Sequence, residues 1–259
     1  MKIKLFAGAA VLVLGTYAAQ AADFAAVYKG SSADVDIWTG PYVGLGGGLA
    51  RHEAQFSDLT GLVGTAGNTL TTIRSGALAG GFAGYNWRHR SFVFGIEGDM
   101  NWVGASVRET TGAQNSFSIS GVQNQDTNWL ATMRARGGIE VESTLIYLTG
   151  GLAVAGVENS YARYCPPAGF CSTGTPNSLS AAFSRRGTQV GWTAGLGVEH
   201  LVDSYWLVRA EARYTDLGRS SVVCRDAGVA TLCQTPGDNY RGAFSDTLLT
   251  GLIGVGYKF

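Results

Sequence analysis

Hydrophobic and polar residues alternate with a period of two along much of this chain. The alternation is sharpest in four segments, at residues 92–102, 129–139, 190–200 and 206–215. In the first of them, Phe94 and Ile96 fall on one face, whereas Glu97 and Asp99 fall on the other. Successive side chains of a β-strand point to opposite faces, so this period predicts strands with one apolar and one polar face.

Four further strands are predicted at residues 40–49, 78–87, 144–157 and 246–259, which brings the total to eight. Small residues are frequent in these four segments, so the contrast between an apolar and a polar face is weaker there. In the first, Val43, Leu45 and Leu49 alternate with glycines. That pattern is expected if one face meets lipid and the other meets a crowded interior where only a hydrogen atom fits.

The spacing of these strands predicts the topology. Three links are hairpin-length turns, at residues 88–91, 140–143 and 201–204. The other four are long, at residues 50–77, 103–128, 158–189 and 216–245. Short and long links alternate strictly. The predicted fold is therefore all-β, an eight-stranded antiparallel up-and-down transmembrane β-barrel with short periplasmic turns and long extracellular loops.

The charged residues of the strands are expected to point into the barrel. An Arg or Lys on the lipid face costs about 2–4 kcal/mol near the midplane, so five basic residues there would cost roughly 10 kcal/mol, as much as a typical domain's whole stability. Inside, acids and bases can neutralise one another. The expected lumen charge network consists of Glu97, Asp99, Arg134, Arg136, Glu199, Arg209, Glu211 and Arg213, and Lys258 shares their polar face.

A soluble β-sandwich is the alternative, because its polar faces would simply meet water. Two groups of aromatic residues favour the barrel, since outer-membrane barrels carry an aromatic girdle at each membrane interface. Trp87, Phe92, Trp206, Tyr257 and Phe259 fall near the short-turn end, and Trp102, Trp129 and Tyr214 fall near the long-loop end.

Composition narrows the function classes. Glycine accounts for 38 of 259 residues, charged residues make up only 15%, and hydrophobic residues reach 46%. The formal net charge is zero, with 19 basic and 19 acidic residues. Such a chain is too apolar for a disordered protein and has no basic field to attract nucleic acid.

The N-terminal residues are typical of an export signal. Lys2 and Lys4 precede an apolar run that ends at Leu14, and Ala19-Gln20-Ala21 offers a cleavage site. We expect a signal peptide at residues 1–21, a flexible periplasmic segment at 22–37 and the barrel at 38–259. The expected location is the outer membrane of a Gram-negative cell.

The C-terminal strand alternates up to a terminal aromatic residue. Ile253, Val255, Tyr257 and Phe259 share one face. They look like the signal by which outer-membrane barrels are recognised for insertion, which makes the barrel-assembly machinery an expected partner.

Several short motifs, in this order and spacing, resemble the alphaproteobacterial outer-membrane (immunogenic) protein family. They are Trp38-Thr39-Gly40-Pro41-Tyr42-Val43-Gly44, Gly84-Tyr85-Asn86-Trp87, Gly95-Ile96-Glu97-Gly98-Asp99, Tyr147-Leu148-Thr149-Gly150-Gly151, Gly191-Trp192-Thr193-Ala194-Gly195, Arg209-Ala210-Glu211-Ala212-Arg213-Tyr214 and Gly256-Tyr257-Lys258-Phe259. The family consists of small eight-stranded barrels of the OmpA type. The resemblance implies an abundant envelope protein that stabilises the outer membrane and meets the host, and some members bind haemin.

Four cysteines depart from what the family leads us to expect. Cys165 and Cys171 fall in the third long link, and Cys224 and Cys233 fall in the fourth. An even number in an exported chain favours disulfide bonds. Three connectivities are open, of which the two local pairs close the shortest loops. Metal binding is the rival hypothesis, but no His lies near any Cys in sequence.

No motif for catalysis or for a cofactor is found. His52-Glu53 begins like a zinc-protease motif, but Phe56 occupies the position of the second His. The GxGxxG and GxSxG patterns are also missing. We therefore expect neither an enzyme nor a cofactor nor a metal site.

The main functional hypothesis is a non-enzymatic structural barrel that supports envelope integrity and displays its loops. Its expected surroundings are outer-membrane lipids and lipopolysaccharide, and a monomer is expected. One alternative is a ligand-binding or adhesive barrel, in which Tyr161, Tyr164 and Phe170 engage haemin or a host molecule. The other is a narrow ion channel, although eight strands leave an interior that side chains just fill.

Overall fold

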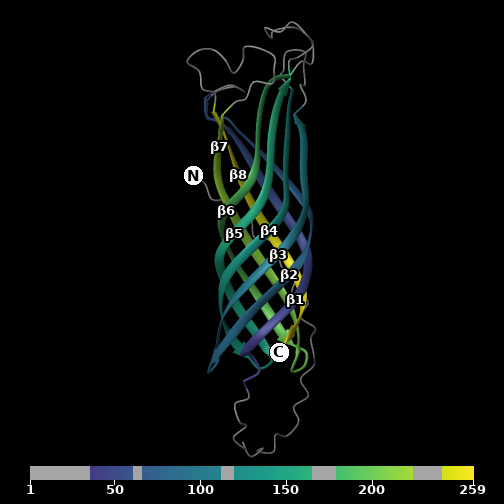
Figure 1. The fold of residues 1–259 in the computed structure, drawn as a ribbon, viewed down its shortest axis with the longest axis vertical. Coiled ribbons are helices and arrows are strands. Elements are labelled where there is room, and N and C mark those ends of the chain that lie inside the picture. The colour runs from purple at the N-terminus through teal and green to yellow at the C-terminus, as the bar shows by residue number, and fades with distance from the viewer. Residues whose placement is uncertain (1–35, 61–65, 112–119, 165–178, 224–240) are drawn as a thin grey trace, which may run out of the picture. The chain divides into compact units, whose positions relative to one another are not determined.

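The eight predicted strands close into a single barrel. The computed structural model describes residues 36–60, 66–111, 120–164, 179–223 and 241–259. Figure 1 shows the strands winding side by side around a common axis. They are β1 (Gly40–Asp58), β2 (Thr69–His89), β3 (Phe92–Thr111), β4 (Ser120–Val141), β5 (Thr144–Tyr164), β6 (Leu179–Leu201), β7 (Trp206–Val223) and β8 (Arg241–Lys258).

Each strand pairs antiparallel with its neighbours in sequence, and β1 also pairs with β8. The sheet therefore has no free edge, and the predicted up-and-down topology is confirmed. Among the described residues, none forms a helix that is long and apolar enough to cross a membrane.

The short turns lie where the sequence predicts them, but the strands are longer than expected. β1 continues to Asp58, nine residues beyond its predicted end at Leu49, and β2 begins at Thr69 instead of Leu78. Much of the predicted long links at residues 50–77, 103–128, 158–189 and 216–245 is therefore barrel wall. We call the end with the short turns the turn end and the opposite end the loop end.

Apolar side chains cover the outer face of the turn-end half of the barrel. They expose 40% to 73% of their surface and include Val43, Leu45, Leu49, Ile96, Met100, Met133, Leu148, Leu152, Leu196, Val208, Ile253 and Val255. Exposed aromatic residues border this band on both sides: Trp87, Phe92, Trp206 and Phe259 at the turn end, and Trp102, Trp192 and Tyr214 at the loop end. An apolar band between two aromatic girdles is the outer surface of a membrane-spanning barrel.

Beyond the loop-end girdle the outer face becomes polar while the strands continue. On β1, exposed Arg51 and Glu53 follow Leu49 on the same face. Three strands also change register near this level, between Trp102 and Ala105, between Thr127 and Trp129, and between Asp216 and Arg219. The barrel wall therefore rises out of the membrane toward the loops.

The inside of the barrel, the lumen, is filled by side chains in layers. One apolar cluster lies at the turn end and consists of Trp38, Tyr42, Phe82, Val93, Leu145, Tyr147, Leu201 and Leu207. A second lies toward the loop end and consists of Ala50, Leu78, Val103, Leu130, Ala153, Ala155, Val157, Leu217, Leu248 and Leu252. On β3, Glu97 and Asp99 lie between Val93 of one cluster and Val103 of the other, so a charged layer separates the two.

The residues just before β1 belong to the turn-end closure. Trp38 is buried, and Ile37 packs against the same apolar cluster. The Asp36 carboxylate accepts hydrogen bonds from the backbone N–H of Trp38, at 3.1 Å, and of Thr39, at 2.9 Å. Partial burial raises the pKa of Asp36, but these hydrogen bonds outweigh burial and hold the pKa below its ordinary value. Residues 36 and 37, the last two of the segment predicted at 22–37, therefore contact the barrel, and the flexibility of the segment stays a prediction.

Candidate functional site in the lumen

The candidate site is built around two carboxylates of β3, which the sequence Gly95-Ile96-Glu97-Gly98-Asp99 places on the inner face. Glu97 accepts hydrogen bonds from Arg134, from Arg209 at 2.7 Å and from Arg136 at 3.3 Å. The Tyr42 hydroxyl also donates to it, at 2.8 Å. Glu97 therefore connects β1, β3, β4 and β7 through one carboxylate.

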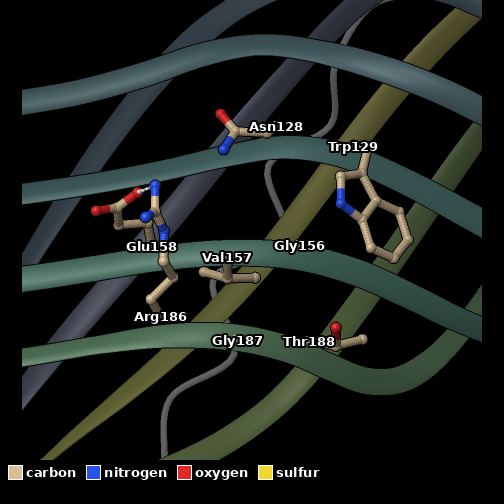
Figure 2. Close-up of a pocket in the computed structure, with 8 residues that line it drawn as sticks. All are labelled: Asn128, Trp129, Gly156, Val157, Glu158, Arg186, Gly187 and Thr188. Atoms are coloured by element: carbon tan, nitrogen blue, oxygen red, sulfur yellow. Dashed lines mark ion pairs between the residues drawn. The ribbon is translucent and has the colours of Figure 1, made fainter.

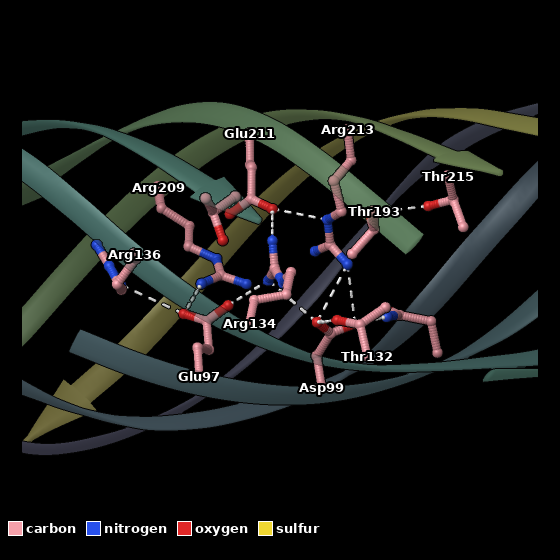
Figure 3. A network of polar contacts seen from close by, with 12 residues as sticks. Glu97, Asp99, Thr132, Arg134, Arg136, Thr193, Arg209, Glu211, Arg213 and Thr215 are labelled. Carbon is pink, nitrogen blue, oxygen red and sulfur yellow. Dashed lines mark hydrogen bonds and ion pairs between the residues drawn. The ribbon is translucent and has the colours of Figure 1, made fainter. Parts of the chain in front are cut away.

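Asp99, two residues further along β3, is held in the same way. Arg213 Nη1 approaches its two carboxylate oxygens at 2.9 and 3.1 Å, and Arg134 Nη2 donates to it at 3.0 Å. Thr132 and Asn101 donate the remaining hydrogen bonds. Figure 3 shows both β3 carboxylates surrounded by arginines that come from β4 and β7.

Two further carboxylates complete the network. Glu199 of β6 contacts Arg136, with Nη1···Oε1 at 2.9 Å and Nη2···Oε2 at 2.7 Å. Glu211 of β7 contacts Arg134 and lies 2.6 Å from Arg213 Nε, and the Tyr147 hydroxyl donates to it at 2.6 Å.

Strand register and small neighbours make room for these long side chains. Glu97 stands directly opposite Arg134, and Glu199 directly opposite Arg209. Gly95 is the register partner of Arg136, and a Cβ at Gly95 would lie 3.0 Å from Arg136 Cγ and closer still to the Asn86 side-chain oxygen. The glycine pattern of the strands therefore corresponds to space that charged and aromatic side chains occupy.

The arginines also pack against aromatic rings of the turn-end cluster. The guanidinium carbon of Arg209 lies 3.4 Å from the centre of the Phe82 ring, and that of Arg136 lies 4.0 Å from the centre of the Tyr147 ring. An aromatic face attracts a cation most strongly where water is excluded.

The network is neutral and almost completely buried. It has four carboxylates and four arginines, a sum of zero, and no member exposes more than 8% of its surface. Buried charges are tolerated when each is paired and hydrogen-bonded, whereas removing one partner leaves an uncompensated charge. All eight residues that the sequence assigns to the lumen charge network come together here. Lys258 lies apart from them, on the inner face of β8 at the turn end.

This arrangement cross-links strands across the lumen. Every carboxylate is occupied by arginines, and apolar clusters fill the lumen on both sides. Within the part of the chain that the structure describes, no group of three or more His, Cys, Asp and Glu side chains could hold a metal ion.

A second polar cluster, which the sequence analysis missed, lies inside the loop-end half. His52 Nε2 and Asp246 Oδ1 are 3.0 Å apart, and Asn159 donates to the other oxygen of Asp246 at 2.9 Å. His52 and Asp246 are completely buried. The sequence analysis placed His52 in the long link at residues 50–77, because the predicted strand ended at Leu49. The available signal was the alternation over residues 50–56. One face carries Ala50, His52, Ala54 and Phe56, and the other carries the polar residues Arg51, Glu53 and Gln55.

The other predicted site residues lie as follows. Ile253, Val255 and Phe259 point outward, and Tyr257 packs edge-on against Trp206 and Phe259. The structure places them on one face but does not test their role in insertion. Cys165, Cys171, Cys224 and Cys233 lie outside the described residues, as do residues 1–21 and Phe170.

Comparison with known sequences identifies one family over almost the whole chain. Residues 7–259 match the family described as outer membrane protein beta-barrel domain. The 31 kDa outer-membrane immunogenic protein of Brucella melitensis is 31% identical over 195 residues, which is 73% of this chain and 75% of the relative. The 25 kDa outer-membrane immunogenic protein of the same species is 26% identical over 223 residues, which is 86% of this chain and 79% of the relative.

Among solved structures, the outer membrane protein OprG from Pseudomonas aeruginosa is similar over 86% of this chain and 97% of its own. Its sequence identity is 12% and the TM-score is 0.44.

Proposed function

Because this chain belongs to the outer-membrane β-barrel protein family, we propose that it is a non-enzymatic structural protein that supports the envelope and displays its loops outside the cell. The observation that carries the proposal is the charge network in the lumen, in which every carboxylate is paired with arginines. Four carboxylates and four arginines bind one another and leave no charged group of the network free for a substrate.

Display of the loops is supported by the height of the barrel. On β1, Asp58 at the strand end lies nine positions beyond Leu49 of the apolar band. At about 3.3 Å per residue and a strand tilt of about 40°, the wall rises roughly 20 Å above the girdle. Such a wall lifts the loops clear of the lipid headgroups.

The test is a deletion strain complemented with variants of the gene. Loss of the protein should increase uptake of a hydrophobic dye and sensitivity to detergent, and the wild-type gene should restore both. A barrel with residues 165–178 replaced by a short glycine-serine linker should restore them equally well. If the loop-exchanged barrel fails although it is folded and present at normal levels, support of the envelope does not come from the barrel.

Loop exchange also separates this proposal from a ligand-binding role. If the loop-exchanged barrel restores the envelope but the cells no longer capture a ligand such as haemin, the loops have a binding function of their own. No described side chain favours a particular ligand for the loops, so the structural role is the proposal that we retain.

A further inference from the structure

We propose that a groove on the outer wall of the barrel, at the loop-end edge of the membrane, binds a sugar ring of the surrounding lipopolysaccharide. This goes beyond support and display, because it assigns the wall itself a ligand. The groove has a volume of about 210 Å³ and crosses β4, β5 and β6. Its lining, shown in Figure 2, includes Asn128, Trp129, Gly156, Glu158, Arg186 and Thr188.

The height of the groove is fixed by strand register. Trp129 pairs with Trp102 of the loop-end girdle on one side and with Gly156 on the other, and Gly156 pairs with Thr188. Two residues below Thr188 on the same face, exposed Val190 belongs to the apolar band. The groove therefore lies where acyl chains end and the headgroups of the outer leaflet begin, which in this membrane are the sugars of lipopolysaccharide.

One side of the groove is an aromatic ring placed against bare backbone. A Cβ at Gly156 would come within 2.3 Å of the Trp129 indole nitrogen, so the indole lies against the strand only because residue 156 is glycine. Thr188, the register partner of Gly156, is exposed on the outer face and lines the groove next to this glycine. An aliphatic sugar face can pack on the outward side of the indole, because a Trp ring offers a large rigid apolar surface.

The other side is a pair of opposite charges. Arg186 Nη2 lies 2.7 Å from Glu158 Oε2, and the side chains are 80% and 44% exposed. Figure 2 shows Gly156 and Gly187 between this pair and the indole. The guanidinium donates hydrogen bonds and the carboxylate accepts them. Because a sugar hydroxyl group can both accept and donate, the pair offers it a donor and an acceptor.

The charge of the groove selects a sugar over a phosphate. Arg186 and Glu158 sum to zero, and the carboxylate repels any anion that approaches the guanidinium. Arginine recognises phosphate through paired hydrogen bonds of its guanidinium, which here already contacts a carboxylate. Asn128 adds a polar group, because the register shift between Thr127 and Trp129 leaves Asn128 without a register partner and exposed at the rim.

The experiment measures binding of the lipid-free core oligosaccharide released from lipopolysaccharide to the full barrel in detergent micelles. The indole N–H signal of Trp129 is followed by nuclear magnetic resonance and is assigned by its loss in Trp129→Phe. We expect a saturable shift of this signal in the wild type. Thr188→Tyr, which places a bulky ring in the groove from the outer face of β6, should weaken binding by about tenfold or more, as expected when access to an aromatic anchor is lost.

Thr71→Tyr is the matched control, because Thr71 is also exposed on the outer face but belongs to β2, which does not line the groove. It should bind like the wild type. If Thr188→Tyr does not show the heat-modifiable gel mobility of a folded barrel, the double variant Arg186→Gln/Glu158→Gln takes its place. No shift in the wild type, or equal affinity in the groove variant, would overturn the proposal. Competition by inorganic phosphate would show an anion site instead, and equally tight binding of dextran would show that lipopolysaccharide is not the preferred source of the sugar.

Discussion

Glu97 on β3 and Arg134 on β4 stand opposite each other in register, and their side chains form an ion pair inside the barrel. Glu97 also holds Arg136 and Arg209. One carboxylate therefore balances parts of three buried cations, which makes it the most connected acid of the network.

Substitution of Glu97 by Gln should therefore destabilise the barrel strongly. The amide keeps the shape but leaves the arginines with an uncompensated charge, and breaking a buried pair in this way costs about 3–5 kcal/mol. Urea unfolding in lipid vesicles, followed by gel mobility, measures the change. Glu158→Gln removes the acid of an exposed pair and should cost no more than about 1 kcal/mol. Equal effects of the two variants would mean that burial of the network contributes little.

The membrane-spanning part of the fold could be predicted from the sequence because lipid imposes a strict period of two. Val43, Leu45 and Leu49 contact lipid, and their neighbours face the lumen. Above the girdle this contrast disappears, since Arg51 and Glu53 meet water and the inner His52 is polar as well. The predicted strands therefore ended at the girdle, whereas the strands of the structure continue beyond it.

The members of the charge network could also be predicted from the sequence, but the partners in each ion pair could not. Alternation places Asp99 and Arg213 on inner faces, yet their contact joins β3 to β7 across the lumen. Such a contact depends on the stagger of the closed barrel, which local sequence does not specify.

Crowding in the lumen makes a specific prediction for Gly48 of β1. A Cβ there would lie 1.9 Å from the backbone oxygen of Gly251, and backbone cannot move aside as a flexible side chain can. Gly48→Ala should destabilise the barrel by about 1–3 kcal/mol, the usual cost of overpacking. The same urea unfolding measures it.

Gly251→Ala is the matched control for that change. Gly251 points outward, and a Cβ there meets no atom within 4 Å. Its stability should stay within about 0.5 kcal/mol of the wild type, as for other substitutions that disturb no packing. A loss as large as that of Gly48→Ala would show that glycine is needed for its backbone freedom and not for space.

The height of the wall can be measured with spin labels at two residues of one face of β1. A label at Leu49 should be accessible to oxygen, which concentrates in lipid, and a label at Glu53 should be accessible to a water-soluble nickel complex. Labelling requires a background in which the four native cysteines are serine. Lipid-like accessibility at Glu53 would place the membrane edge higher than the girdle of Trp102, Trp192 and Tyr214.

The turn between β6 and β7 should respond to acid through Asp203. Backbone N–H groups of Trp206 and Tyr205 each donate to its carboxylate at 2.7 Å and hold its pKa below the ordinary value. A lowered folded-state pKa stabilises the turn above the unfolded pKa of about 3.9, and this contribution is lost as the pH falls through the folded pKa. The amide signals of Tyr205 and Trp206 should titrate together with a midpoint below about 3.9. Asp203→Asn should abolish that titration, and a midpoint at or above the ordinary value would contradict the hydrogen bonds.

The filled lumen predicts that the barrel does not conduct ions steadily. The charged layer lies between two apolar clusters, so an ion that entered it would first have to leave water at Leu248 or at Leu207. Planar-bilayer recordings of the wild type should show no stable openings. Arg134→Ala and Arg209→Ala should remain silent too, because neither change opens an apolar cluster. Stepwise currents whose size changes with either substitution would show that the arginines line a conducting path, and the barrel would then be a channel and not a closed support.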